Sequence, residues 1–170
     1  MKEFEAYDTM ITSYYNSNSN KILPLSSWEF YGEYNATFFN FKNDLDNLRK
    51  ITKRWDFDKD YQTVLIKERS VIVITDPDLK IVYVTHNIKK MSGYTQDEVL
   101  GRSPKMFQGK NTCQETSRSI RKLVTKQQPF EVSILNYRKD MSTYMCKIKG
   151  YPVYNKRGKL VNYLAFEKVA

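Results

Sequence analysis

The chain has 170 residues, of which 41% are hydrophobic and 28% are charged, with only 6 Gly and 5 Pro. This size and composition are typical of one folded domain with an extension, and they exclude a disordered, collagen-like or low-complexity chain. No stretch reaches the ~18 apolar residues of a membrane span, and the acidic N-terminus MKEFEAYDTM lacks the apolar run of a signal peptide. We therefore expect a cytoplasmic protein without a membrane segment.

The net charge of +9 is unevenly distributed along the chain. Residues 1–65 carry 8 basic and 10 acidic side chains, whereas residues 66–170 carry 20 and 9. A basic domain attracts phosphate groups and nucleic acid. Because the basic residues are dispersed rather than run together, a solvated surface is the favoured interpretation and nucleic acid is not an expected partner.

Two helices are predicted in an N-terminal extension that covers residues 1–60. Apolar residues at helical spacing predict the first over about 3–15. The second is predicted over about 27–55, because Ser26 and Glu29 have capping-box spacing and a long apolar stripe follows. That stripe is mostly aromatic and heptad-like, and consists of Tyr31, Tyr34, Phe38, Phe41, Leu45, Leu48 and Trp55. It pairs with another chain, lies on the chain's own sheet, or does both, and the polar run 56–60 is the expected linker.

The pattern changes to short strands in a second domain, residues 64–170. Strands are predicted at 71–74, 81–84, about 130–137, 143–153 and 159–168, with short helices over about 87–124. Two strands, then helices, then three strands indicate an α+β fold with an antiparallel sheet.

Alternation along these strands sorts their side chains into two faces. Asn136 and Cys146 fall on the apolar, inward face, where a polar group needs a partner. A bound ligand, a backbone carbonyl or a buried water would each provide one. The last strand is apolar on both faces, with Val161, Tyr163 and Ala165 on one side, so the outer face of the sheet needs a cover. The aromatic helix is the candidate, from the same chain or from a dimer partner.

Residues that carry enzyme chemistry are scarce. His86 is the only histidine, Cys113 and Cys146 are far apart, and no glycine-rich phosphate loop occurs. We therefore expect neither an enzyme nor a metal site.

Two segments carry a resemblance to a known family. VIVITDPDLKIVYVTHNIKKMSGYTQDEVLGRSPKMFQG (71–109) and FEVSILNYRKDMSTYMCKIKGYPVYNKRGKLVNYLAFEK (130–168) together resemble a PAS domain. This resemblance implies a PAS fold, a five-stranded antiparallel sheet with short helices on one face. Within the family the chain is most similar to the light-oxygen-voltage type, which binds FMN. The photoactive cysteine of that type falls on Pro104, so no cysteinyl adduct can form.

The resemblance also implies the positions that would contact a flavin, FMN or FAD. Gln108 and Asn136 match the type's amides, while Ser103, Cys146 and Glu167 replace others. Lys105 and Arg121 match the residues that hold the phosphate. The flavin ring would thus lose much of its amide edge, whereas the phosphate end is retained.

Two hypotheses about function follow. The first is a sensory signalling module that acts through ligand- or partner-dependent association, as a homodimer formed by the N-terminal helix and the outer sheet face. The alternative is a flavin-binding photoreceptor that works without the adduct.

Overall fold

A computed structural model describes residues 25–170, with side chains from Phe39 onward. The predicted helix 3–15 and the side chains of Tyr31, Tyr34 and Phe38 lie outside these described residues. The chain divides into two units, residues 1–39 and 40–170. The elements are α2 (Leu25–Thr52), α3 (Tyr61–Ile66), β1 (Val71–Thr75), β2 (Ile81–Val84), α4 (Ile88–Ser92), α5 (Gln96–Val99), the 3₁₀-helix η1 (Pro104–Phe107), α6 (Gln114–Thr125), β3 (Phe130–Tyr137), β4 (Thr143–Tyr154) and β5 (Leu160–Val169).

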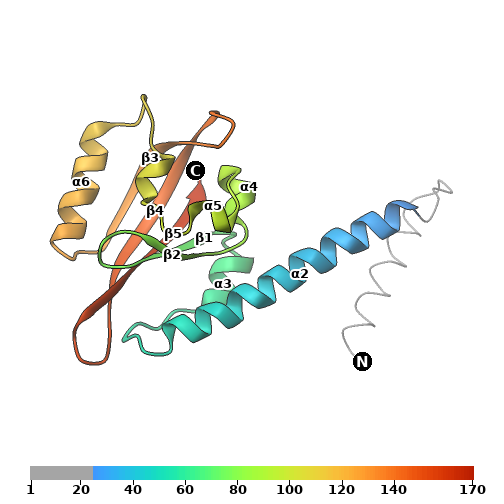
Figure 1. Cartoon of the computed structure of the whole chain (residues 1–170), viewed down its shortest axis with the longest axis horizontal. Coiled ribbons are helices and arrows are strands. Elements are labelled where there is room, and N and C mark those ends of the chain that lie inside the picture. The colour runs from blue at the N-terminus through green and yellow to red at the C-terminus, as the bar shows by residue number, and fades with distance from the viewer. Residues whose placement is uncertain (1–24) are drawn as a thin grey trace. The chain divides into compact units, whose positions relative to one another are not determined.

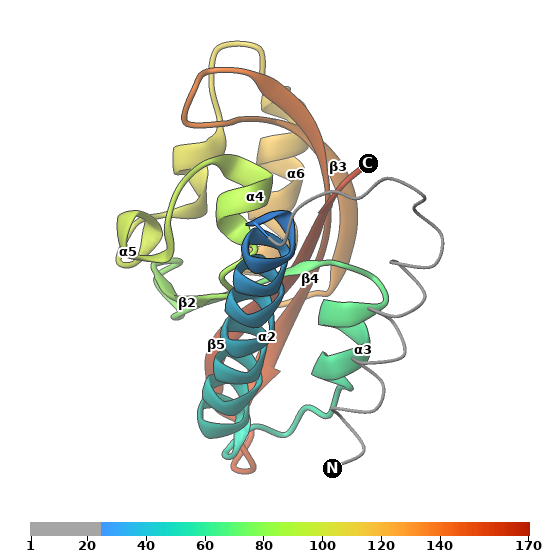
Figure 2. The same ribbon diagram turned by 90° about the vertical axis from the view of Figure 1, so that its right-hand side faces the viewer.

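The five strands form one antiparallel sheet in the order β2-β1-β5-β4-β3. This confirms the predicted α+β fold, and each strand agrees with its prediction to within one residue. The first and last strands of the chain's sheet region meet in its middle, because β1 pairs with β5 over Val71–Thr75. Figures 1 and 2 show α6 on one side of the sheet and α3 with the C-terminal part of α2 on the other.

The outer face of the sheet is covered by its own chain. Leu48 of α2 and Val64 and Leu65 of α3 are buried against outward-facing sheet residues, among them Leu164 and Phe166. The half-buried Phe41 and Leu45 pack on the same cluster. Of the two interpretations of the aromatic stripe, the structure therefore supports packing on the chain's own sheet for the described part of the helix.

Two details of the predicted extension differ from the structure. The helix ends at Thr52 rather than at 55, so Trp55 does not lie on the helical stripe. Its ring is 6% exposed, its Nε1 donates to Asn162 Oδ1 over 3.1 Å, and its backbone bridges to Asn155. Helix α3 was not predicted, and its N-cap Asp60 accepts a hydrogen bond from the Thr63 amide. The polar run before α3 therefore ends in a helix cap.

Val161 lies on the outer face of β5, opposite to the face predicted for it. The pairing of β4 with β5 shifts between Val153 and Tyr154, so Val161 is an extra residue in a bulge and packs with the outer cluster. Tyr163 remains on the inner side, where its hydroxyl donates to the Val124 carbonyl of α6 over 2.9 Å. A bulge shifts the alternation by one residue and leaves no composition signal.

Candidate functional site

The inner face of the sheet carries a polar cluster inside an apolar core. Asn136 is 4% exposed, Tyr144 5%, Cys146 0% and Glu167 5%. Asn136 and Tyr144 are directly opposite each other on β3 and β4, and the Cys146 thiol donates to Glu167 Oε2 over 3.7 Å. Three of the residues predicted as cofactor contacts are thus brought together by the strand pairing.

Tyr144 is a member of this cluster that the sequence analysis did not single out. Its hydroxyl is buried beside the Asn136 side chain, but it makes no hydrogen bond of normal geometry in the described part of the chain. A buried hydroxyl without a partner costs roughly 1–3 kcal/mol. The sequence does predict this position, because residues two apart on a strand share a face, and the ring of Tyr144 therefore points to the same side as the Cys146 thiol.

The Glu167 carboxyl holds its proton at a higher pH than an ordinary surface carboxyl does. Burial raises the pKa of Glu167 to about 7, although the hydrogen bond from Cys146 opposes the change. Burial also raises the pKa of the Cys146 thiol, with the charge of Glu167 acting in the same direction. The thiol is thus unreactive. A protonated Glu167 offers one donor and one acceptor, as an amide does.

The other predicted contacts lie on the helical side of the domain. Ser103 caps η1, Pro104 is its first residue, and Lys105 is exposed. Gln108 Oε1 accepts a hydrogen bond from the Ser117 hydroxyl at 3.1 Å, while Arg121 is exposed on α6. The structure therefore does not place Lys105 and Arg121 in the buried cluster.

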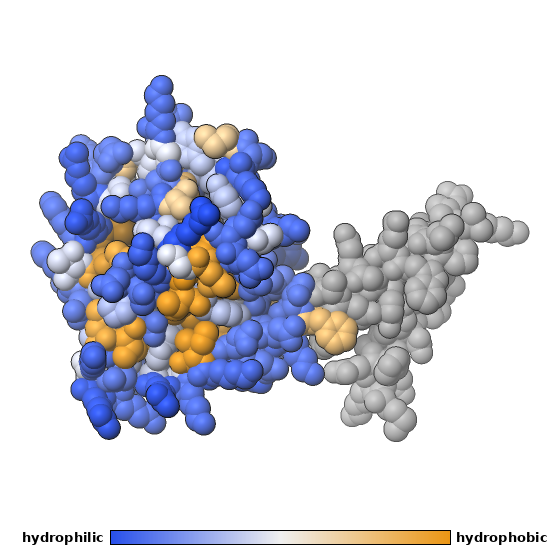
Figure 3. Space-filling model, viewed as in Figure 1, coloured by the Kyte–Doolittle hydropathy of each residue, from blue (hydrophilic) through white to orange (hydrophobic). Residues whose placement is uncertain are grey.

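Helix α6 has one apolar side but buries none of its residues. Ile120, Leu123 and Val124 are only half buried, although Ile120 packs against the inner core. Figure 3, which views the domain from the same side as Figure 1, shows a largely hydrophilic surface interrupted by apolar side chains. An apolar helix face that remains half exposed is incompletely packed against the sheet.

A second polar centre lies on the other side of the sheet, at α2. Asp44 is 3% exposed and accepts hydrogen bonds from the Tyr83 hydroxyl at 2.6 Å and the His86 amide at 2.9 Å. Its carboxylate also contacts His86 Nδ1. Burial and the Asp44 carboxylate raise the pKa of Tyr83, which therefore stays protonated and donates. These contacts fasten α2 to β2 and to the residues that follow it.

Other classes of site find no support among residues that the structure describes. No group of three or more His, Cys, Asp or Glu side chains there is arranged to hold a metal ion. Nor is any helix within the described ranges long and apolar enough to cross a membrane.

Sequence comparison with known proteins finds relatives of about a third identity. Protein TWIN LOV 1 of Arabidopsis thaliana is 37% identical over 98 residues, which are 55% of this chain and 25% of that protein. A blue-light-activated histidine kinase of Brucella abortus is 30% identical over 89 residues, 52% of this chain and 18% of the kinase. The chain therefore matches a quarter or less of these relatives.

Solved structures agree with these relatives. The light-state structure of the blue-light photoreceptor Aureochrome1 LOV superposes with a TM-score of 0.56 at 31% identity, covering 58% of this chain and 80% of that one. A light-oxygen-voltage domain studied with a flavin analogue gives 0.61 at 30% identity, covering 66% and 86%.

A family model described as PAS domain matches residues 69–168, the segment that forms the helices α4 to α6 and the sheet except for the last residue of β5. The match spans both sequence segments that carried the resemblance, and the observed strand order is built from them. The chain belongs to the PAS domain family.

Proposed function

We propose that this chain is a cytoplasmic sensory PAS module in which a small molecule at the inner polar cluster controls the docking of α2 on the outer face. The observation that carries this proposal is that the inner face of the sheet has buried polar groups, whereas a helix covers the outer face. The inner face holds the buried Glu167 and the Tyr144 hydroxyl, which makes no hydrogen bond of normal geometry although it lies beside Asn136. The outer face is covered by the chain's own α2, which Asp44 fastens.

The sheet connects the two faces through single residues of β5. Phe166 packs in the outer cluster, and its neighbour Glu167 belongs to the inner one. A ligand that moves Glu167 or changes its charge therefore acts on the residue next to the one that α2 and α3 cover. Ligand binding at Glu167 can therefore be coupled to the position of α2, provided that α2 has two alternative arrangements on the outer face.

Association follows from release of the helix. A homodimer through the outer face requires that residues 40–52 first leave it, because Leu48 covers it in the described chain. We expect sedimentation velocity to show a reversible monomer–dimer equilibrium as the protein concentration rises. A chain that sediments as a monomer at every concentration would contradict a module that signals by association.

The second candidate function is a flavin photoreceptor without the adduct, and the donor set of the inner cluster favours it. A protonated Glu167 and the Asn136 amide each supply a donor and an acceptor, and the Tyr144 hydroxyl makes no hydrogen bond of normal geometry. These residues would hold the ring edge, and Lys105 and Arg121 the phosphate. A bound flavin would supply light absorption and electron acceptance. Two of the similar proteins named above are a blue-light-activated histidine kinase and a blue-light photoreceptor, which supports the same candidate.

Reversal of charge at Arg121 tests this candidate. We expect wild-type protein, purified with FMN and FAD added at lysis, to show the visible flavin band, and Arg121→Glu to retain at most about a tenth as much FMN, because a charge-assisted contact to phosphate is lost. The matched control is Arg118→Glu, three positions earlier on α6 and likewise exposed. Equal retention by both variants would refute the phosphate assignment, and a wild-type protein without the band would refute the candidate.

A further inference from the structure

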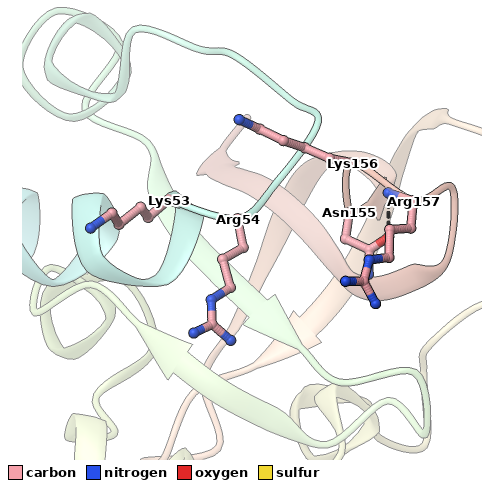
Figure 4. A pocket seen from close by; sticks show the side chains of 5 residues that line it. All are labelled: Lys53, Arg54, Asn155, Lys156 and Arg157. Carbon is pink, nitrogen blue, oxygen red and sulfur yellow. Dashed lines mark hydrogen bonds between the residues drawn. The ribbon is translucent and has the colours of Figure 1, made fainter.

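A strongly basic cleft lies outside the inner cluster, where the end of α2 meets the turn between β4 and β5. It has a volume of about 610 Å³ and is lined by Lys53, Arg54, Asn155, Lys156 and Arg157. Figure 4 shows that the cationic side chains come from two segments about a hundred positions apart in sequence. Arg54 and Arg157 extend to the same side, while Lys156 reaches toward the loop after α2.

The backbone that carries these side chains is held in place. The Asp56 amide donates to the Tyr154 carbonyl over 2.8 Å, which joins the loop after α2 to the end of β4. In the turn, Asn155 Oδ1 accepts hydrogen bonds from the amides of Arg157 at 2.9 Å and Lys159 at 3.0 Å. The two basic segments therefore face a common cleft without any need to fold on binding, which lowers the cost of capturing a ligand.

The charges of this cleft are not balanced by ion pairs. None of the four cations takes part in a salt bridge with an acid in residues 39–170, where other lysines and arginines do. Asp56 and Asp58 line a smaller neighbouring cavity, together with Lys53 and Lys156. The four cations still outnumber these two acids, so the cleft remains positive.

A favourable interaction with the dipole of α2 explains only two of the four cations in the cleft. Lys53 and Arg54 follow the C-terminus of α2, where positive charge interacts favourably with the helix dipole. Lys156 and Arg157 belong to a turn between two strands, where no such benefit exists. Bringing two further cations to the same place costs electrostatic repulsion, which an anionic ligand would relieve.

We propose that this basic cleft binds the phosphate groups of a small anionic ligand. Arg54 and Arg157 supply planar guanidinium groups that match phosphate oxygens in pairs, and Lys156 adds a point charge. The cleft joins the last residues of α2 to the sheet, so an occupied cleft holds that end of the helix in place. The ligand chemistry is a phosphate group, whether it is carried by a free anion or by a lipid headgroup.

Titration calorimetry with inorganic pyrophosphate tests the proposal on the full chain. We expect one site per chain, and Arg54→Gln/Arg157→Gln should weaken its binding by about tenfold or more, as loss of two charge-assisted contacts would. The matched control is Lys89→Gln/Lys90→Gln on α4, which removes the same charge from two exposed residues elsewhere. Its affinity should stay within about twofold of wild type.

Vesicles and duplex DNA separate the sources of the phosphate. Phosphatidylcholine vesicles with and without phosphatidylserine are sedimented with each protein. The site is assigned to a lipid headgroup if the anionic vesicles capture the wild-type protein and the Lys89/Lys90 variant but not the Arg54/Arg157 variant. Equal weakening of pyrophosphate binding in both variants would overturn the proposal, as would absent binding of both phosphate probes. Binding of duplex DNA alone, weakened equally in the two variants, would also overturn it, because that is general attraction to a basic protein.

Discussion

Replacement of Glu167 by Gln is expected to stabilise the protein above neutral pH and to flatten its pH dependence. Burial raises the folded-state pKa of Glu167 from 4.5 to about 7. The folded state therefore binds the proton more tightly than the unfolded state. Stability from this group is full below pH ~4.5 and falls as pH rises to ~7, by about 3 kcal/mol at most. The glutamine side chain of the variant carries no charge at any pH and keeps a donor and an acceptor.

Urea unfolding at several pH values from about 5 to about 8 measures this difference. The wild-type free energy of unfolding should decline across the range relative to that of Glu167→Gln, with the two values similar at the acidic end. The control is Glu131→Gln, where hydrogen bonding by Lys147 lowers the pKa of an exposed carboxyl. Because the folded state lowers the pKa of Glu131 instead of raising it, the charged form of Glu131 stabilises the fold, and this variant should lose stability slightly at neutral pH. Parallel curves for wild type and Glu167→Gln would show that Glu167 is not a buried titrating group.

Removal of the Asp44 carboxylate is the second change with a large expected effect. Asp44→Ala leaves the Tyr83 hydroxyl and the His86 amide, donors of two half-buried residues, without their acceptor. Loss of one partner from a buried, charge-assisted network costs about 3 kcal/mol. Because Asp44 fastens α2, we also expect the amides of residues 40–52 to lose protection from hydrogen exchange before the sheet does.

Asp46→Ala is the matched control for this prediction. Asp46 lies two positions away on the same helix, and its ion pair with Arg49 is 3.4 Å long with both side chains largely exposed. A surface pair of this kind contributes about 0–1 kcal/mol, so the variant should unfold almost as wild type does. Equal losses of stability and of protection in both variants would mean that Asp44 acts only through helix propensity.

The sheet could be predicted from sequence because local signals determine it. Runs of β-branched residues such as Val71–Thr75 and turn residues such as Asp76 and Pro77 mark where strands begin and end. The turn after β3 shows the limit of such rules. Met141 in this turn has a φ of +70°, a conformation that residues other than glycine rarely adopt and that no run of residue types marks.

The polar centres were harder to predict, because distant segments build them. Asp44 looked like one of many acids on a helix, yet its partners Tyr83 and His86 lie about forty positions later. The basic cleft likewise brings Arg54 and Arg157 together. The number and spacing of basic residues along the chain could not predict that these two lie close in space. Inward-facing Asn136 and Cys146 were predictable, because alternation along one strand places them without tertiary information.

Hydrogen exchange measured as a function of protein concentration tests the central claim most directly. In the proposed function, α2 must leave the outer sheet face before the chain associates. We therefore expect the amides of residues 40–52 to become less protected as the dimer forms, while those of β5 become no less protected. Unchanged protection of residues 40–52 in a fully formed dimer would contradict it, because the outer face would then still be covered by the chain's own helix.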